Sequence, residues 1–532
     1  MSGRPDRQCR KALVDPAGVS RGHSTGGDGP RREGPNVGPR DDPDGLVDEA
    51  STAAIPPSWW ACIREPAVKP PRSGAERSLS PASPETLPHP AWSEDPWEAF
   101  LSRDNLARAL EARRAQRRGA RSDGMTTEAL RPHLRAAWPA IRRSLDEGTY
   151  RPSPVRRVTI REPGGGTREL GVPTVLDRFL QQALSQVLSP IFEPSFSDHS
   201  FGFRPGRSAH QAVEAARRVI EAGLTWVVDV DLDRFFDRVG HDALMARVAR
   251  RVDDRRVLRL IRRYLDAGVM VEGVKVATTE GTPQGSPLSP LLANIMLDDL
   301  DHELERRGHA FVRYADDLRV YVASERAAAR LLEGVTTFVE GRLKLKVNRD
   351  KSGVARATRR GLLGFGFFER EGRVRVRLDP RAKHRLKARL RHLTSRRWSI
   401  AMSVRLARLD RFLAGWAAYF ALAETPSVFT ELDEWLRRRL RQVRWKEWKR
   451  PAARRRNLVA LGIPPGYAHQ WANTRRGYWR VSGSPILTRA LPNRYWADLG
   501  LVSMSDRVHR LRKHWRTAGC GPARPVVWEG AG

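Results

Sequence analysis

The chain has 532 residues, and its 95 lysine and arginine residues against 61 aspartate and glutamate residues give a formal charge of +34. A chain of this length holds several domains, and so large a positive charge favours a polyanionic partner. Arginine far outnumbers lysine, which suits the recognition of phosphate. Cys9, Cys62 and Cys520 are too few for a disulfide framework, and no apolar segment is long enough to span a bilayer. Secreted, disulfide-scaffold and membrane-spanning proteins are excluded, and a nucleic-acid-binding protein of a reducing compartment, without a membrane partner, is favoured.

Residues 1–92 have the composition of a disordered leader. Proline and glycine are frequent there, and basic and acidic residues balance, so the positive excess belongs to the rest of the chain. Such a segment cannot bury enough apolar surface to become ordered. An alternative is that this stretch was included upstream of the protein by a wrong start codon.

Helices and a hairpin are the expected elements after the leader. Helical periodicity covers 97–117 and 128–145, with a break at Asp123-Gly124 between them. The region 155–170 predicts two strands around a glycine turn, and a helix is expected over 176–188.

Acidic side chains gather at two short apolar stretches that predict strands. The β-branched run 225–230 is followed by Asp231, and 311–322 predicts two strands joined by a tip that carries Asp316 and Asp317. Burying acids beside valines is costly unless cations neutralise them, and hard divalent cations bind carboxylate oxygens. These carboxylates therefore predict a site for two Mg²⁺ ions, which can activate a 3′-hydroxyl and stabilise a leaving pyrophosphate. The alternative is two surface turns whose acids are only solvated.

The stretch Tyr314-Ala315-Asp316-Asp317 resembles the catalytic motif of reverse transcriptases. Six further blocks resemble, in the same order, those of the reverse transcriptases encoded by bacterial group II introns; they are 170–178 with Gln181, 201–210, 231–237 with His241 and Asp242, 281–294, 345–348 with Lys351, and 363–365. The blocks 415–420, 432–439, 445–449 and 477–479 resemble the thumb and maturase region (domain X) of the same family. Together with Asn105 and 124–126, the resemblance covers about residues 95–530.

The resemblance implies roles for individual residues. Asp231, Asp316 and Asp317 would be the catalytic carboxylates, with Asp231 and Asp316 the closest ligands of two Mg²⁺ ions, and Lys351 would protonate the leaving pyrophosphate. The implied substrate contacts are Arg168 on the triphosphate, Phe236 against a ribose 2′-hydroxyl, Pro283, Gln284 and Gly285 on template and incoming nucleotide, and Tyr314 and Ala315 of the motif itself. Without the resemblance, Phe236 would be an ordinary core residue, Arg168 a solvated charge and 283–285 a turn.

Two features depart from the family pattern. Arg161-Glu162 stands where the family usually has Pro-Lys, so an acid replaces a phosphate-binding lysine. Arg157 and Arg161 are the candidates to compensate for that loss. After residue 500 the chain has Cys520, His509 and His514, which cannot build the zinc-supported endonuclease of many relatives. We therefore expect no DNA-cleavage domain.

The region after residue 380 predicts strongly basic helices. One apolar stripe runs from Met402 to Phe420, and a second contains Leu432 and Val443, which indicates ordinary core packing. Arginine and tryptophan residues occupy the rest of the second helix; they are Arg437, Arg438, Arg441, Arg444, Trp445, Trp448 and Lys449. A solvated face is the usual interpretation, but this density favours RNA, with phosphates on arginine and bases on the rings.

The predicted fold is α+β, a right-hand polymerase with an antiparallel palm sheet followed by a helical thumb and domain X. The expected domains are a leader at 1–92, a helical extension at 93–150, fingers and palm at 151–375, thumb and domain X at 376–495, and a basic tail at 496–532. The expected function is RNA-directed DNA synthesis and maturase activity in a bacterial cytoplasm, near the nucleoid, with intron RNA, an RNA template, a DNA primer or target and dNTPs as partners. The alternatives are a non-catalytic RNA-binding maturase and the reverse transcriptase of a retron, a diversity-generating element or a defence system.

Overall fold

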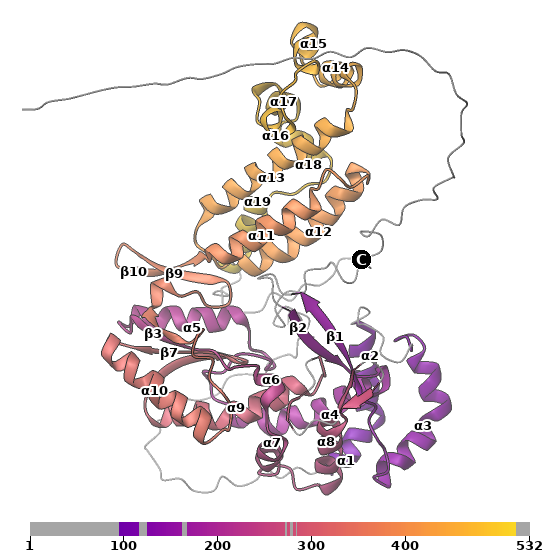
Figure 1. The fold of residues 1–532 in the computed structure, drawn as a ribbon, viewed down its shortest axis with the longest axis vertical. Helices are drawn as coiled ribbons and strands as arrows, with labels where there is room; N and C mark the ends of the chain where they lie inside the picture. Colours follow the sequence, from indigo (N-terminus) through magenta and orange to yellow (C-terminus); the bar gives the residue numbers. More distant parts are fainter. Residues whose placement is uncertain are drawn as a thin grey trace, which may run out of the picture. The chain divides into compact units, whose positions relative to one another are not determined.

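The computed structural model describes residues 95–115, 125–161, 167–271, 274–276, 280–282 and 285–517 (Figure 1). The predicted leader at 1–92, the turn at 164–166 and Glu162 lie outside the described residues. No helix of the described residues is long and apolar enough to cross a membrane.

Three helices form the first described part of the chain: α1 (Pro96–Leu101), α2 (Arg103–Ala115) and α3 (Leu130–Asp146). The helical periodicity expected over 97–117 is confirmed in the described residues as two helices, which are separated at Ser102. The Ser102 hydroxyl donates to the carbonyl of Ala99 and accepts from the N–H of Asn105. Asn105 is buried, and its amide donates to the carbonyls of Phe100 (2.9 Å) and Ala183 (3.0 Å). These bonds attach α2 to α4 (Val175–Phe192), the helix expected over 176–188.

The predicted hairpin at 155–170 is confirmed as β1 (Val155–Arg161) and β2 (Thr167–Val172), which pair antiparallel. β4 (Val269–Val271) adds to β1 in parallel, and β5 (Val274–Val276) completes a four-stranded sheet in the order β2-β1-β4-β5. This sheet is therefore mixed rather than purely antiparallel.

The second sheet is antiparallel throughout, with the order β6-β7-β3-β8. β3 (Trp226–Val230) is central, and β6 (Ala310–Tyr314) and β7 (Asp317–Val322) form the strand–tip–strand unit expected over 311–322. β8 is Gly353–Arg356. The helices that contact this sheet are α5 (Ala209–Glu221), α9 (Ser289–Arg306) and α10 (Glu325–Gly341). Alternate residues of β3 enter different cores: Val227 belongs to one buried cluster, while Val228 and Val230 belong to another.

Smaller elements connect these layers. They are the 3₁₀ turns Glu193–Ser195 and Ala357–Arg359, the helices α6 (Phe235–Arg238), α7 (His241–Val248) and α8 (Arg255–Asp266), and a two-stranded sheet of β9 (Phe365–Arg370) and β10 (Arg373–Leu378).

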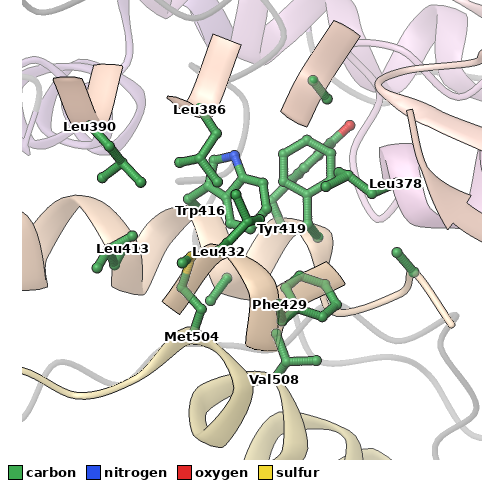
Figure 2. Close-up of a cluster of buried hydrophobic side chains, with 14 of the residues drawn as sticks. Leu378, Leu386, Leu390, Leu413, Trp416, Tyr419, Phe429, Leu432, Met504 and Val508 are labelled. Atoms are coloured by element: carbon green, nitrogen blue, oxygen red, sulfur yellow. The ribbon is translucent and has the colours of Figure 1, made fainter. Parts of the chain in front are cut away.

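The rest of the described chain is helical, as expected after residue 380. Its elements are α11 (Pro380–Leu393), α12 (Met402–Phe420), α13 (Pro426–Glu447), α14 (Pro451–Ala460), α15 (Pro465–Ala472), α16 (Tyr478–Ser482), α17 (Pro485–Ala490), α18 (Asn493–Asp498) and α19 (Met504–Thr517). Both predicted apolar stripes are buried, and Figure 2 shows Trp416 of α12 and Leu432 of α13 beside Met504 and Val508 of α19. The segment expected as a basic tail, 496–532, thus contains a packed helix.

The first turn of α19 is capped by a side chain from another helix. The carboxylate of Asp433 on α13 accepts from the N–H groups of Met504 (2.8 Å) and Ser505 (3.0 Å) and from the Ser505 hydroxyl (2.5 Å). Asp433 is buried, so these bonds satisfy a carboxylate that would otherwise be costly in this core. The predicted succession of antiparallel strands and then helices is confirmed in this coarse form.

Candidate active site

Asp231 is the first residue after the central strand β3. Its N–H donates to the hydroxyl of Ser352 (2.9 Å), and its carbonyl accepts from the N–H of Asn348 (2.8 Å). Because Asn348 and Ser352 flank Lys351, this backbone pairing brings the lysine to the carboxylate, with Nζ 3.9 Å from Asp231 Oδ2. Two blocks more than one hundred residues apart in sequence therefore meet at one strand end.

Asp316 and Asp317 lie at the turn between β6 and β7. Tyr314 pairs with Asp317, which leaves Ala315 and Asp316 as a two-residue turn. Ala315 has φ +58°, a left-handed conformation that alanine rarely adopts without external support. Since Val230 pairs with Leu318 in the antiparallel ladder, the next residue, Asp231, is level with Asp317. The predicted meeting of these carboxylates agrees with this register.

The three carboxylates carry like charges near one another, and this contributes to the shifted pKa values of Asp317 and Asp231. Burial, followed by the negative charges of Asp316 and Asp231, raises the pKa of Asp317 to about 7. Burial also raises the pKa of Asp231, while Lys351 opposes this rise and Asp316 adds to it. Arg319 Nη1, 2.9 Å from Asp317 Oδ1, supplies part of the missing positive charge. The site therefore favours additional cations.

The donor set suits hard divalent cations, because it consists of partly exposed carboxylate oxygens that repel one another. Among the residues that the structure describes, no three His, Cys, Asp or Glu side chains lie close enough together to enclose a metal ion. The three aspartates interact electrostatically without forming a closed cage of ligands.

A second charged cluster lies beside the carboxylates and was not expected from the sequence. Asp229 pairs in register with Arg319 across β3 and β7, and their side chains form an ion pair. Arg360 Nη1 lies 3.3 Å from Asp229 Oδ2. Because Arg319 also contacts Asp317, the cluster links the central strand to the turn between β6 and β7. The sequence signal for this cluster was the position of Asp229 and Arg319 within two short stretches of mainly apolar residues.

Phe236 is buried in α6, next to the loop that leads to residues 283–285. The carbonyl of Phe236 accepts from the N–H of Thr282 (2.6 Å), and the N–H of Gly281 donates to the carbonyl of Val239 (2.8 Å). A ring nitrogen of the buried His241 lies 2.8 Å from the carbonyl of Gly281. Phe236 and this loop, predicted to contact the same nucleotide, are thus joined through the backbone.

The loop also contacts the first sheet and α4. Gly285 has φ +113°, and a Cβ there would lie 3.3 Å from the carbonyl of Gly171 on β2. The Ser286 hydroxyl donates to the side-chain oxygen of Gln181 (2.7 Å), so blocks 170–181 and 281–294 meet. Pro283 and Gln284 lie outside the described residues, as does the side chain of Arg168, whose backbone belongs to β2.

The predicted RNA contacts on α13 need correction. Trp445 and Trp448 are buried and form a T-shaped pair with ring centroids 5.9 Å apart, so the prediction that they stack on RNA bases is wrong. Arg438, Arg441 and Arg444 face the segments after α15. Arg438 lies over the ring of Trp479 at 4.1 Å, Arg441 donates to the carbonyl of Ser482 (2.9 Å), and Arg444 lies over the ring of Tyr495 at 5.8 Å. Arg437 is half-buried and Lys449 is exposed.

Trp479 of α16 is an aromatic residue with an exposed side chain. It is 39% exposed and lies beneath the guanidinium of Arg438. The sequence signal for it was the Gly-Tyr-Trp block at 477–479. The combination of an exposed ring and a cation on α13 fits the stacking role first expected of the two buried tryptophans.

Comparison with known proteins gives two family matches. Residues 160–367 match the family described as reverse transcriptase (RNA-dependent DNA polymerase), and residues 383–462 match the group II intron, maturase-specific domain. The first match covers the strand ends and the turn that carry Asp231, Asp316 and Asp317, and the second covers α12 and α13.

The chain is also similar to individual proteins. Protein YkfC of Escherichia coli is 34% identical over 43% of this chain and 70% of its own length. The group II intron-encoded protein LtrA of Lactococcus lactis is 41% identical over 30% of this chain and 27% of its own length, so the match spans about a quarter of that relative. A solved partial Cas6-RT-Cas1–Cas2 complex aligns with 24% identity and a TM-score of 0.30 over 47% of this chain and 43% of that chain.

Proposed function

The chain belongs to the reverse transcriptases and maturases encoded by group II introns, a family of RNA-directed DNA polymerases, and from this premise we propose which of its residues perform each step. The polymerase site is formed by Asp231, Asp316 and Asp317. The first sheet and its helices act as fingers, the second sheet as palm, and the helices within 376–495 as thumb and domain X.

The observation that carries the proposal is the convergence of three like charges at one edge of the palm sheet. The register of β3 and β7 and the raised pKa of Asp317 support it. Mutual repulsion of this kind is relieved when a divalent cation binds, and Mg²⁺ is the cation we propose. Two such ions, when bound, would activate the primer 3′-hydroxyl and stabilise the leaving pyrophosphate.

The remaining side chains bind and orient the reactants. Lys351 lies beside Asp231, where its ammonium group is placed to give a proton to pyrophosphate. Phe236 would lie against the sugar of the incoming dNTP and exclude a ribose 2′-hydroxyl. Arg168 would hold the triphosphate, and Gly285, whose backbone closely approaches β2, would bind template and nucleotide together with Pro283 and Gln284.

The second part of the proposed function is binding of the intron's own RNA, which assists its folding and splicing before it is copied into DNA. Support comes from the maturase-specific match and from the exposed ring of Trp479 beneath Arg438. This match disfavours a reverse transcriptase of a retron or a defence system. Binding should weaken steeply with salt, because phosphate contacts release counterions.

The test is incorporation of dNTPs on a primed RNA template with Mg²⁺, comparing the wild type with Asp316→Ala and with the exposed control Asp253→Ala. Asp316→Ala should lose at least about 10²-fold in rate, the usual effect of removing one group that stabilises transition-state charge, and Asp253→Ala should match the wild type. Background signals from all three proteins, with tight intron RNA binding, would instead establish the non-catalytic maturase.

A further inference from the structure

A buried ionic cluster lies next to the turn that carries Asp316 and Asp317. Arg313 on β6 pairs with Asp301 on α9 through three contacts, Nε to Oδ1 at 2.7 Å, Nε to Oδ2 at 3.0 Å and Nη2 to Oδ2 at 2.5 Å. Its Nη1 donates to Asn294 Oδ1 at 3.0 Å. The three side chains are at most 1% exposed. A pair removed so fully from water is costly to form, so it needs good geometry and further hydrogen bonds.

This cluster reaches the turn itself. Arg313 Nη1 also donates to the carbonyl of Ala315 at 2.9 Å. That carbonyl belongs to the peptide bond between Ala315 and Asp316, the two turn residues. Because Ala315 has φ +58°, the turn is held in a conformation that its own side chain disfavours. The guanidinium is therefore placed to hold this peptide in the orientation that presents Asp316 and Asp317.

The other side of the turn is held by the 201–210 block. Asn294 Nδ2 donates to the carbonyl of Gly202 at 2.9 Å, and the N–H of Phe201 donates to the carbonyl of Arg313 at 2.9 Å. A Cβ at Gly202 would overlap the backbone nitrogen of Ala315, so only glycine permits this approach. The turn thus lies between Gly202 on one side and Arg313 on the other, and Asn294 joins the two.

We propose that Arg313, Asp301 and Asn294, together with Gly202, are positioning residues that set the orientation of the Ala315–Asp316 peptide and thereby the placement of the metal-binding carboxylates. The inference rests on the proposed polymerase site. An arginine that served only to join β6 to α9 would need Asp301 alone, whereas this one also donates to the turn carbonyl and to the residue that binds Gly202.

The test compares Arg313→Lys with the matched control Arg247→Lys. Arg247 also pairs with an aspartate of α9, Asp299, at 2.9 Å, and donates to the carbonyl of Ala243 on its own helix, α7. A lysine at 313 keeps the charge beside Asp301 but cannot reach Asp301, Asn294 and the turn carbonyl from one nitrogen. We expect the single-turnover rate constant of Arg313→Lys to fall about 10- to 100-fold, as for a displacement of reacting groups by about 1 Å. Binding of the primer–template should stay within about twofold, and Arg247→Lys should match the wild type in both.

A second readout is Mn²⁺ affinity, measured by electron paramagnetic resonance without nucleotide. Arg313→Lys should weaken Mn²⁺ binding, and Asp316→Ala should weaken it further. If the wild type bound Mn²⁺ but incorporated no dNTP, the proposed function would fail, and the positioning role would still be decided by the effect of Arg313→Lys on Mn²⁺ affinity.

Two further variants distinguish a loss of positioning from a loss of folded protein. Asn294→Ala keeps the Arg313–Asp301 pair, and Gly202→Ala pushes on the turn from the opposite side; each should reduce the rate constant and the Mn²⁺ affinity of the folded fraction. The inference is overturned if all three variants lower only the amplitude of the reaction, in proportion to folded protein, while the rate constant and Mn²⁺ affinity of that fraction equal those of the wild type.

Discussion

Replacing Asp229 by asparagine should destabilise the palm sheet, although the two side chains have nearly the same shape. Asp229 pairs with Arg319 across β3 and β7 and lies 3.3 Å from Arg360. The side chains of Asp229 and Arg319 are each 11% exposed, so water can replace little of the lost charge. After the substitution, Arg319 keeps its ion pair with Asp317 and its hydrogen bonds to the carbonyls of Leu318 (3.5 Å) and Gly361 (3.4 Å), but it loses the negative charge of Asp229.

The expected loss follows from the cost of leaving a buried guanidinium partly unpaired. Breaking a buried ion pair by removing one partner costs about 3–5 kcal/mol, and the remaining Asp317 contact reduces this to about 2–4 kcal/mol. Burial lowers the pKa of Arg319 to about 10, as expected for a guanidinium held away from water. Arg319 should then draw Asp317 away from bound cations, so the polymerisation rate should fall as well.

Urea unfolding of Asp229→Asn, Arg319→Met and the double variant measures this energy as a double-mutant cycle. We expect a coupling energy above about 1 kcal/mol, since directly contacting buried charges do not act additively. The matched control is Asp198→Asn, which removes an aspartate that pairs with Arg207 but is 86% exposed, and should change stability by less than about 1 kcal/mol. Additive single effects, or an Asp229→Asn protein as stable as the control variant, would refute the reasoning.

Three further predictions concern pH, RNA and the proton donor. Burial raises the pKa of Asp298 to about 6, so the stability that its protonated form provides is lost as the pH rises through that value. Between pH 4 and 7, the free energy of unfolding of the wild type should fall by about 2–3 kcal/mol relative to that of Asp298→Asn. Urea unfolding that gave the same pH dependence for both proteins would contradict this. Trp479→Ala should weaken RNA binding by about 1–3 kcal/mol in a filter-binding assay, with Trp479→Phe close to wild type, and unchanged affinity would show that the ring binds no base. Lys351→Met removes the positive charge that opposes the burial-driven rise in the pKa of Asp231. The acid limb of the profile of polymerisation rate against pH should therefore move to higher pH. A lower maximal rate with the acid limb at its wild-type pH would argue against this role.

The strands could be predicted because they follow from local patterns in the sequence. The convergence of the acidic residues could be predicted because it follows from the order of the family's blocks along the chain. A β-branched run marked β3, two apolar stretches around an acidic tip marked the β6–β7 hairpin, and the resemblance of the ordered blocks implied that Asp231 and Asp316 converge. The partners of the buried arginines could not be predicted in this way. A charged residue in an apolar strand indicates that a counter-charge exists, but only the fold shows that Arg313 meets Asp301 on α9 and that Arg319 meets Asp229.

The error at Trp445 and Trp448 has a related cause. A helical wheel of α13 shows one apolar stripe, containing Leu432 and Val443, and assigns everything else to solvent. In the structure α13 also contacts α16 and α19, so a second side of the helix is covered by segments that follow it in the chain. Helical spacing cannot reveal a second buried side when the covering elements are short and distant in sequence.

The capped end of α19 has a practical consequence for shortened forms of this protein. A fragment ending at residue 503 would retain both family matches, which stop at residue 462, and would look complete by that measure. It would nevertheless leave the carboxylate of Asp433 in an apolar interior without its three donors and uncover Phe429 and Leu432. A fragment intended to isolate the maturase part should therefore extend through Thr517, the end of α19.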